Sequence, residues 1–277
     1  MMPFLKLVHY ELFRVRKMYL VMLGLTLVVQ FAGIFVYAHS YMNRVQSAMK
    51  LQGITQLEYA VKYQPASFYQ YSLNSIWFMA PIAMGAAIVA IYVFVIWYRD
   101  WYAKSIFIYR LMMLPVSRMA VYLAKLTTIM LLTLGLVAFE LLILPFQNAL
   151  FEARLPEVLR IPLTLTEIVA NHPLLKILAP AQFIDFILHY SMGLTAVTIL
   201  FTAIMMERSY RLRGVIAGII YGSLALAIFL APVFFSEMRP YLLYPKELLA
   251  LELVMVLIIL SGSGALSSYL IKNKVTL

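Results

Sequence analysis

Six long apolar stretches constrain what this chain of 277 residues can fold into. A helix needs about 20 apolar residues to cross the hydrocarbon core of a bilayer. With 64% hydrophobic and only 12% charged residues, the chain carries more apolar side chains than a globular core can hide. We therefore predict an all-α, polytopic membrane protein whose residues 1–277 form a single transmembrane domain. The six predicted transmembrane helices are Met18–Ala38, Ile76–Tyr98, Met119–Phe146, Ala181–Met206, Gly214–Phe235 and Leu248–Ile271.

A separate amphipathic helix is predicted over residues 3–17, ahead of the first apolar stretch. Its apolar residues recur at helical spacing and its basic residues lie off that stripe, which is typical of a helix in the membrane interface. The apolar stripe is Phe4, Val8, Leu12 and Val15, and the basic residues are Lys6, Arg14, Arg16 and Lys17. The alternative is a basic flank that only sets the topology.

The distribution of Lys and Arg predicts the orientation. If the N-terminus is cytoplasmic, the four cytoplasmic segments contain 13 of these residues, and the longer outer segments contain eight. Short cytoplasmic segments carry an excess of Lys and Arg. We therefore expect both termini on the cytoplasmic side of the plasma membrane.

Two segments outside the apolar stretches are substantial, residues 39–75 and 147–180. In the second, Thr164 precedes Glu167 by three residues, which is the spacing of a capping box at a helix start. The sequence Asn171-His172-Pro173 that follows is expected to end such a helix.

Catalytic and metal-binding signatures are absent from the sequence. It has no Gly-x-x-x-x-Gly-Lys phosphate loop, no His-Glu-x-x-His and no Gly-x-Ser-x-Gly. It has no cysteine, and its 17 methionines form no clustered array of soft ligands. We therefore expect no enzyme activity, no cofactor and no metal in this chain. If ATP drives the protein, another polypeptide binds the nucleotide.

Gly214, Gly218 and Gly222 recur every four residues along one face of the fifth stretch. Small residues on one face allow helix backbones to approach closely in a membrane. The sequence favours packing within the chain, and a seam between two copies is the alternative.

Acidic residues interrupt three of the stretches. A carboxylate within lipid costs a few kcal/mol or more, so such residues usually face protein or water. Asp185 and His189 are four residues apart and so share a helix face. The candidates for a translocation path or a proton relay are Glu140, Asp185, His189 and Glu252. The alternative for Asp185 and Glu252 is an acid at the interface, near a helix end.

The segment after the second stretch resembles the permease subunit of a type-2 ATP-binding-cassette transporter of the bacterial exporter type. In that family an acid follows the second span, a Thr or Ser comes five residues later, and a Leu-Pro-x-Ser-Arg element precedes a Lys in the third span. Asp100, Ser105, Leu114-Pro115-Val116-Ser117-Arg118 and Lys125 match this order. Asp100 stands where Glu is commoner, and Lys104 where Gly is frequent.

The resemblance implies that this segment carries a coupling helix, which docks in a groove of a separate ABC ATPase. Residues Glu207–Arg213 would supply a second contact, the ATPase would bind ATP and Mg, and a second permease subunit, identical or paralogous, would complete an export path. The residues to which it assigns ATPase coupling are Asp100, Lys104, Ser105, Arg110, Leu114, Pro115, Ser117, Arg118, Arg208 and Arg211.

Three other functions stay open at this stage: a membrane sensor or assembly factor without transport, a membrane-embedded enzyme, and a secondary transporter. The enzyme would need polar groups that converge at one depth. A secondary transporter usually shows inverted repeats, and none is evident in the sequence. The transported substrate is not indicated, and nucleic acid is not an expected partner.

Overall fold

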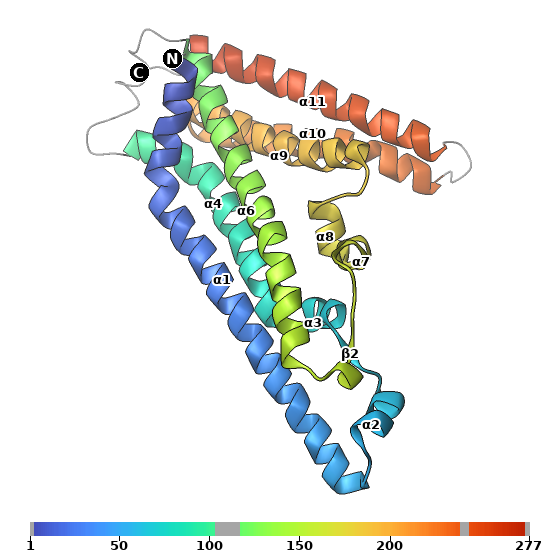
Figure 1. Ribbon diagram of the computed structural model, residues 1–277. Helices are drawn as coiled ribbons and strands as arrows, with labels where there is room; N and C mark the ends of the chain where they lie inside the picture. Colours follow the sequence, from blue (N-terminus) through green and yellow to red (C-terminus); the bar gives the residue numbers. More distant parts are fainter. Residues whose placement is uncertain (1–2, 103–116, 239–243, 275–277) are drawn as a thin grey trace. The chain divides into compact units, whose positions relative to one another are not determined.

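The computed structural model describes residues 3–102, 117–238 and 244–274. These residues are helical apart from short connections and two strands of two residues each (Figure 1). Their elements, in chain order, are α1 (Pro3–Gln52), α2 (Gln56–Tyr63), β1 (Ala66–Ser67), α3 (Phe68–Asn74), α4 (Ile76–Tyr102), α6 (Arg118–Arg154), the 3-10 turn η1 (Glu157–Leu159), β2 (Arg160–Ile161), α7 (Leu165–Asn171), α8 (Pro173–Leu178), α9 (Phe183–Tyr210), α10 (Leu212–Met238) and α11 (Pro245–Asn273).

Six of these helices, α1, α4, α6, α9, α10 and α11, are long and apolar enough to cross a membrane. Five of them contain one predicted stretch each, and α9 contains the remaining one, Ala181–Met206, except for its first two residues, so the all-helical, six-span prediction is confirmed at this level. The chain is a multi-span membrane protein.

The prediction of a separate N-terminal amphipathic helix is wrong. Residues 3–17 are the beginning of α1, which runs for 50 residues without interruption. Neither proline nor glycine occurs between Phe4 and Leu23, so nothing stops the main-chain hydrogen bonding where the basic segment meets the apolar one. Helix α1 also continues through residues 39–52, which had been assigned to an outer loop. At 1.5 Å per residue it is about 75 Å long, against about 30 Å for the hydrocarbon core.

The residues group into two compact units, and the division falls inside helices. Unit one comprises residues 1–13, 90–130 and 187–277, and unit two comprises residues 14–89 and 131–186. Helices α1, α4, α6 and α9 therefore contribute residues to both units, and α10 and α11 belong to unit one.

The glycine face of α10 packs against α9 within unit one. A Cβ atom on Gly214 would lie 1.9 Å from the carbonyl oxygen of Met206, and one on Gly218 would lie 3.2 Å from the Cβ of Ala203. At Gly222 the nearest atom would be 3.8 Å away, an ordinary contact. Gly214 and Gly218 thus lie close to α9 within the chain, and the approach is tightest where α9 turns into α10.

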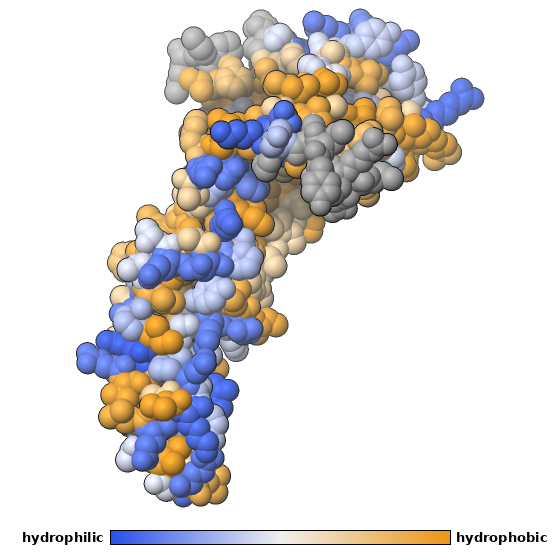
Figure 2. All heavy atoms as spheres, turned by 90° about the vertical axis from the view of Figure 1, so that its right-hand side faces the viewer, coloured by the Kyte–Doolittle hydropathy of each residue, from blue (hydrophilic) through white to orange (hydrophobic). Residues whose placement is uncertain are grey.

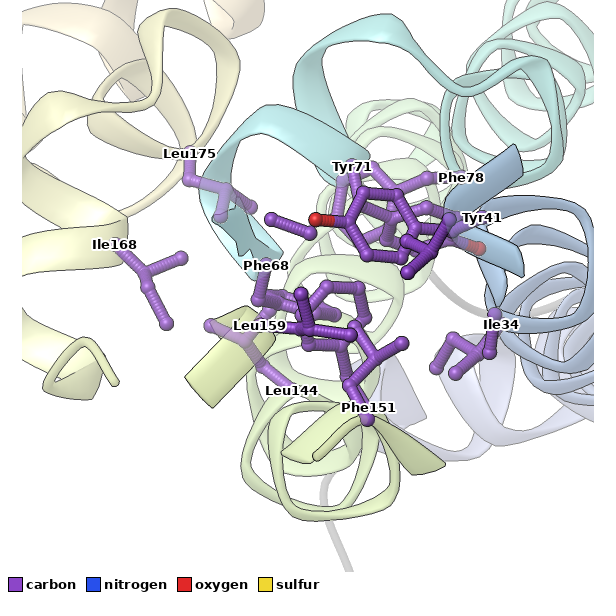
Figure 3. Packing of buried hydrophobic residues seen from close by; sticks show 14 of the residues in the cluster. Ile34, Tyr41, Phe68, Tyr71, Phe78, Leu144, Phe151, Leu159, Ile168 and Leu175 are labelled. Atoms are coloured by element: carbon purple, nitrogen blue, oxygen red, sulfur yellow. The ribbon is translucent and has the colours of Figure 1, made fainter. Parts of the chain in front are cut away.

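An aromatic-rich cluster forms the core of unit two (Figure 3). Tyr71 of α3 lies 5.9 Å, centroid to centroid, from Phe151 of α6, and Phe68 meets the same ring edge-on at 5.7 Å. Strands β1 and β2 pair in parallel beside it, with Ala66 opposite Arg160. The buried members are Ile34, Ala38, Tyr41, Val45, Tyr59, Ala66, Phe68, Tyr71, Phe78, Leu144, Phe151, Leu155, Leu159, Ile168 and Leu175.

The predicted capping box is confirmed at α7. The Thr164 hydroxyl accepts a hydrogen bond from the Glu167 N–H, and the Glu167 carboxylate accepts one from the Thr164 N–H. These hydrogen bonds to Thr164 lower the pKa of Glu167. Helix α7 ends at Asn171, as expected.

His172 then caps the next helix, which the sequence did not predict. Its Nδ1 accepts a hydrogen bond from the Leu175 N–H, and the ring is fully buried against Phe78 and Tyr69. Burial lowers the pKa of His172. The ring is therefore held in its neutral form, with Nδ1 as the acceptor.

Hydrophobic side chains are exposed over much of the surface, as lipid contact requires (Figure 2). Among the six spans, α10 and α11 are the least covered by the rest of the chain. Around α2, at the bottom of Figure 2, hydrophilic and hydrophobic residues are interspersed. The exposed apolar residues there are Leu51, Leu57 and Val61.

Gly214→Ala is expected to destabilise the protein by about 1–3 kcal/mol, because the new methyl group would overlap the main chain of Met206. Thermal unfolding in detergent measures this. Gly222→Ala is the matched control on the same helix, and its melting midpoint should stay near that of the wild type. Equal effects of the two substitutions would contradict the close approach at Gly214.

The wild-type protein is expected to lose stability as the pH falls below about 6.5, the ordinary pKa of histidine. Because the pKa of His172 is lowered in the folded state, the unfolded chain takes up the proton first. His172→Asn keeps a side chain that caps helices well but removes the titration. Its melting midpoint should therefore decline less on acidification, and parallel pH profiles of the two proteins would exclude this role.

Candidate functional site

A buried cluster of charges joins three helices within unit one. The Lys125 Nζ on α6 donates to Glu11 Oε1 on α1 at 2.8 Å, to the Asp100 carboxylate on α4, and to the carbonyl oxygen of Ile96 at 2.7 Å. Arg99 on α4 donates to the other Glu11 oxygen at 2.9 Å. We call these four charged residues, Glu11, Arg99, Asp100 and Lys125, the ion cluster.

The ion cluster is balanced, with two acids and two bases. Lys125 and Asp100 are fully buried, and Glu11 is nearly so. The Lys125 ammonium also lies 5.1 Å from the centre of the buried Trp97 ring, an arrangement that favours a cation. A buried charge is tolerated when ion pairs and hydrogen bonds satisfy it. The three helices are therefore held in a single register at this point.

Sequence reasoning missed Glu11. It is the only acid in the first 57 residues and stands among basic ones, and this isolation was the available signal. Asp100 and Lys125 had been selected from the motif. The structure pairs them although 25 residues separate them in the chain.

The predicted ATPase-coupling residues fall into four groups. Asp100 is buried in the ion cluster, so its carboxylate does not lie on the surface. Ser117 is exposed at the start of α6, and the Arg118 guanidinium donates to the Ile271 carbonyl oxygen of α11 at 3.1 Å. The candidates outside the described residues are Lys104, Ser105, Arg110, Leu114 and Pro115.

The other two coupling candidates lie at the turn from α9 to α10. The Arg208 guanidinium stacks over Tyr98 and Trp101 of α4, 5.1 Å and 4.7 Å from their ring centres. The Tyr98 hydroxyl donates to Glu207. Arg211 is exposed and takes a positive φ of 55° in the turn itself. This turn is thus attached to the end of α4, directly before the segment that carries the motif.

A second buried polar group lies in unit two. The Gln30 amide on α1 donates to Glu140 Oε1 on α6 at 2.9 Å and to the Phe78 carbonyl oxygen on α4 at 3.3 Å. The Gln147 amide on α6 donates to Gln30 Oε1 at 2.8 Å. Gln30 and Gln147 are fully buried, and Glu140 is 5% exposed. We call Gln30, Glu140 and Gln147 the amide network. The two glutamines were missed, although an uncharged amide within an apolar stretch (Gln30) or directly after one (Gln147) was a visible signal.

The four candidates for a translocation path lie on three helices, α6, α9 and α11. Glu140 belongs to the amide network. Asp185 lies in the first turn of α9 and His189 one turn later, both half-buried. Glu252 is half-buried near the start of α11. Within the described ranges, no three His, Asp or Glu side chains gather where they could hold a metal ion.

Hydroxyl groups connect α9, α10 and α11 in unit one. Thr202 on α9 and Ser267 on α11 share a hydrogen bond of 2.9 Å, and Tyr221 on α10 and Ser263 on α11 share one of 2.6 Å. The small residues of α11 therefore serve polar contacts between helices as well as close packing.

Comparisons of the chain with models of protein families, with curated proteins and with solved structures give no match.

Lys125→Met is expected to destabilise the protein by about 3–5 kcal/mol, because it leaves two acids buried with one base. Adding Asp100→Asn restores the balance of charge between Glu11 and Arg99. The double variant should therefore melt above the single variant, and thermal unfolding in detergent measures both.

Lys62→Met is the control for this pair, since Lys62 is exposed on α2. It should change the melting midpoint little. A double variant that melts below Lys125→Met would show that charge balance is not what stabilises the ion cluster.

Proposed function

We propose that this chain is the membrane-spanning permease subunit of an ATP-driven exporter, coupled to a separate cytoplasmic ABC ATPase. The observation that carries the proposal is the ion pair between Asp100 and Lys125. Both residues belong to the motif that resembles type-2 permeases, and their pairing anchors the chain on either side of residues 103–116. An anchored, charged and aromatic segment is what a docking handle for a soluble partner requires.

The contacts of the ion cluster suggest how movement would pass from such a handle to the spans. Asp100 lies near the C-terminal end of α4, and its partner Lys125 lies two turns into α6. Glu11 on α1 also pairs with Lys125, so the ion cluster connects α1 to both helices. A displacement of the segment by the ATPase would act on three helices at once. It can shift the populations of two conformations only if the ATPase contacts differ between them.

Partner proteins would supply the remaining parts of the transporter. The ATPase would bind ATP and Mg, and this chain would act as permease without enzyme activity of its own. A second permease subunit, identical or paralogous, would complete the path, and the exposed apolar faces of α10 and α11 offer it surface in addition to lipid. Both termini would be cytoplasmic in the plasma membrane. An amphipathic or peptide-like substrate would suit the apolar spans.

Arg211→Glu is expected to reduce the amount of ATPase that co-purifies with the chain about tenfold, equivalent to about 1.4 kcal/mol of binding free energy. Arg211 is exposed and outside the ion cluster, so a reversed charge there tests docking more cleanly than one at the buried Asp100. ATP hydrolysis in the purified fraction and mass spectrometry of its components provide the measurement. The control is Lys50→Glu at the far end of α1, which is also exposed and should retain the ATPase.

A wild-type chain that purifies alone, and stimulates no ATP hydrolysis after reconstitution, would reject the exporter and favour a sensor or assembly factor. The orientation can be tested in the same cells, because the native chain has no cysteine. A single cysteine at Ser117 should be protected from impermeant reagents applied outside. Labelling there would reverse the proposed topology.

A further inference from the structure

Glu140 lies within an apolar part of α6. It is the only charged residue between Lys125 and Glu152, and on both sides the sequence consists largely of Leu, Ile, Val, Phe and Thr. Leu144, one turn further along α6, and Phe78, whose carbonyl oxygen accepts from the same Gln30 amide as Glu140, belong to the apolar cluster of unit two (Figure 3). Glu140 is also only 5% exposed, so an ionised carboxylate at this position would have little contact with water.

The groups around Glu140 are neutral. Helix α1 contributes the Gln30 amide, α6 contributes Gln147, and α4 contributes only a main-chain carbonyl oxygen. From α3 the Tyr71 hydroxyl donates to the Gln30 carbonyl oxygen at 3.4 Å, and burial raises the pKa of Tyr71 to about 12, so this group carries no charge.

The basic residue of α6 beyond this network, Arg154, is engaged elsewhere. Its guanidinium lies 4.3 Å from the centre of the Phe35 ring. None of the ion pairs found among the described residues includes Glu140. The charge balance that stabilises the ion cluster of unit one therefore has no counterpart in the amide network.

The amide network also has fewer donors than acceptors. Gln147 Oε1 is buried and accepts no hydrogen bond from the described residues. An isolated ionised carboxylate in an apolar interior costs many kcal/mol, and one amide hydrogen bond offsets only a small part of this. A bound proton removes the charge and adds one donor to a network that is short of donors.

We propose that Glu140 is a proton-binding site in the membrane interior. The carboxyl group holds one proton while Gln30 and Glu140 are packed together. When α1 and α6 separate enough to admit water, the O–H bond breaks, the proton passes to water and a carboxylate remains. The inference does not depend on the proposed export function. In an exporter, it would add a protonation step to the conformational cycle.

Infrared spectroscopy tests the site directly on the whole purified chain, in a detergent without ester carbonyls. At neutral pH the wild type should show the carbonyl stretch of a protonated carboxyl group, and Glu140→Gln should lose it. Glu252→Gln is the matched control, since Glu252 is also an acid within a span but is half-exposed near a helix end. It should leave the band in place. A wild-type spectrum without the band, or a band that persists in Glu140→Gln, would overturn the proposal.

The pH dependence of stability is a second and independent measurement. A glutamine resembles the protonated glutamate in shape and has no proton to lose. As the pH rises from mildly acidic to mildly alkaline, the melting midpoint of the wild type should fall by roughly 2–4 °C or more relative to that of Glu140→Gln. A constant difference between the two proteins across this range would contradict proton release from Glu140.

Discussion

The buried ammonium group of Lys125 is the interaction on which the packing of unit one depends. A lysine at this depth can be accommodated only if acids from other helices reach it, and Glu11 and Asp100 do so from α1 and α4. Arg99 then balances the second acid. Because each of these charges needs the others, none of the three helices can shift alone without leaving a charge unpaired. A buried ion pair of this kind defines the register of helices more than it adds net stability.

The amide network shows the same physics with a different outcome. In the ion cluster, four charges cancel one another within hydrogen-bonding distance. In the amide network, one acid bonds to a neutral amide and lies among apolar side chains, and none of the ion pairs in the described part of the chain includes it. Where the protein supplies no countercharge, the proton is the smallest species that can provide one. The acids of the ion cluster are thus neutralised by basic side chains of the protein, and the acid of the amide network by a proton taken from solution.

The sequence was sufficient for the features that depend on local chemistry. Hydropathy located all six spans, glycine spacing identified the close packing of α10 on α9, and Thr164 with Glu167 identified the start of α7. The sequence was insufficient where a structural feature depends on contacts between residues that are far apart in the chain. The end of an amphipathic pattern was taken as the end of a helix, but a change of pattern does not interrupt main-chain hydrogen bonding, and no proline or glycine interrupts α1 there. Likewise Glu11, Gln30 and Gln147 acquire their roles from partners on other helices.

Helices α1 and α6 contribute residues to both polar groups. Helix α1 contributes Glu11 to the ion cluster and Gln30 to the amide network, and α6 contributes Lys125 to the first and Glu140 with Gln147 to the second. Each of the two helices is continuous between its two contributions, so a single element takes part in both polar groups. With a break after residue 17, Glu11 and Gln30 would belong to separate elements.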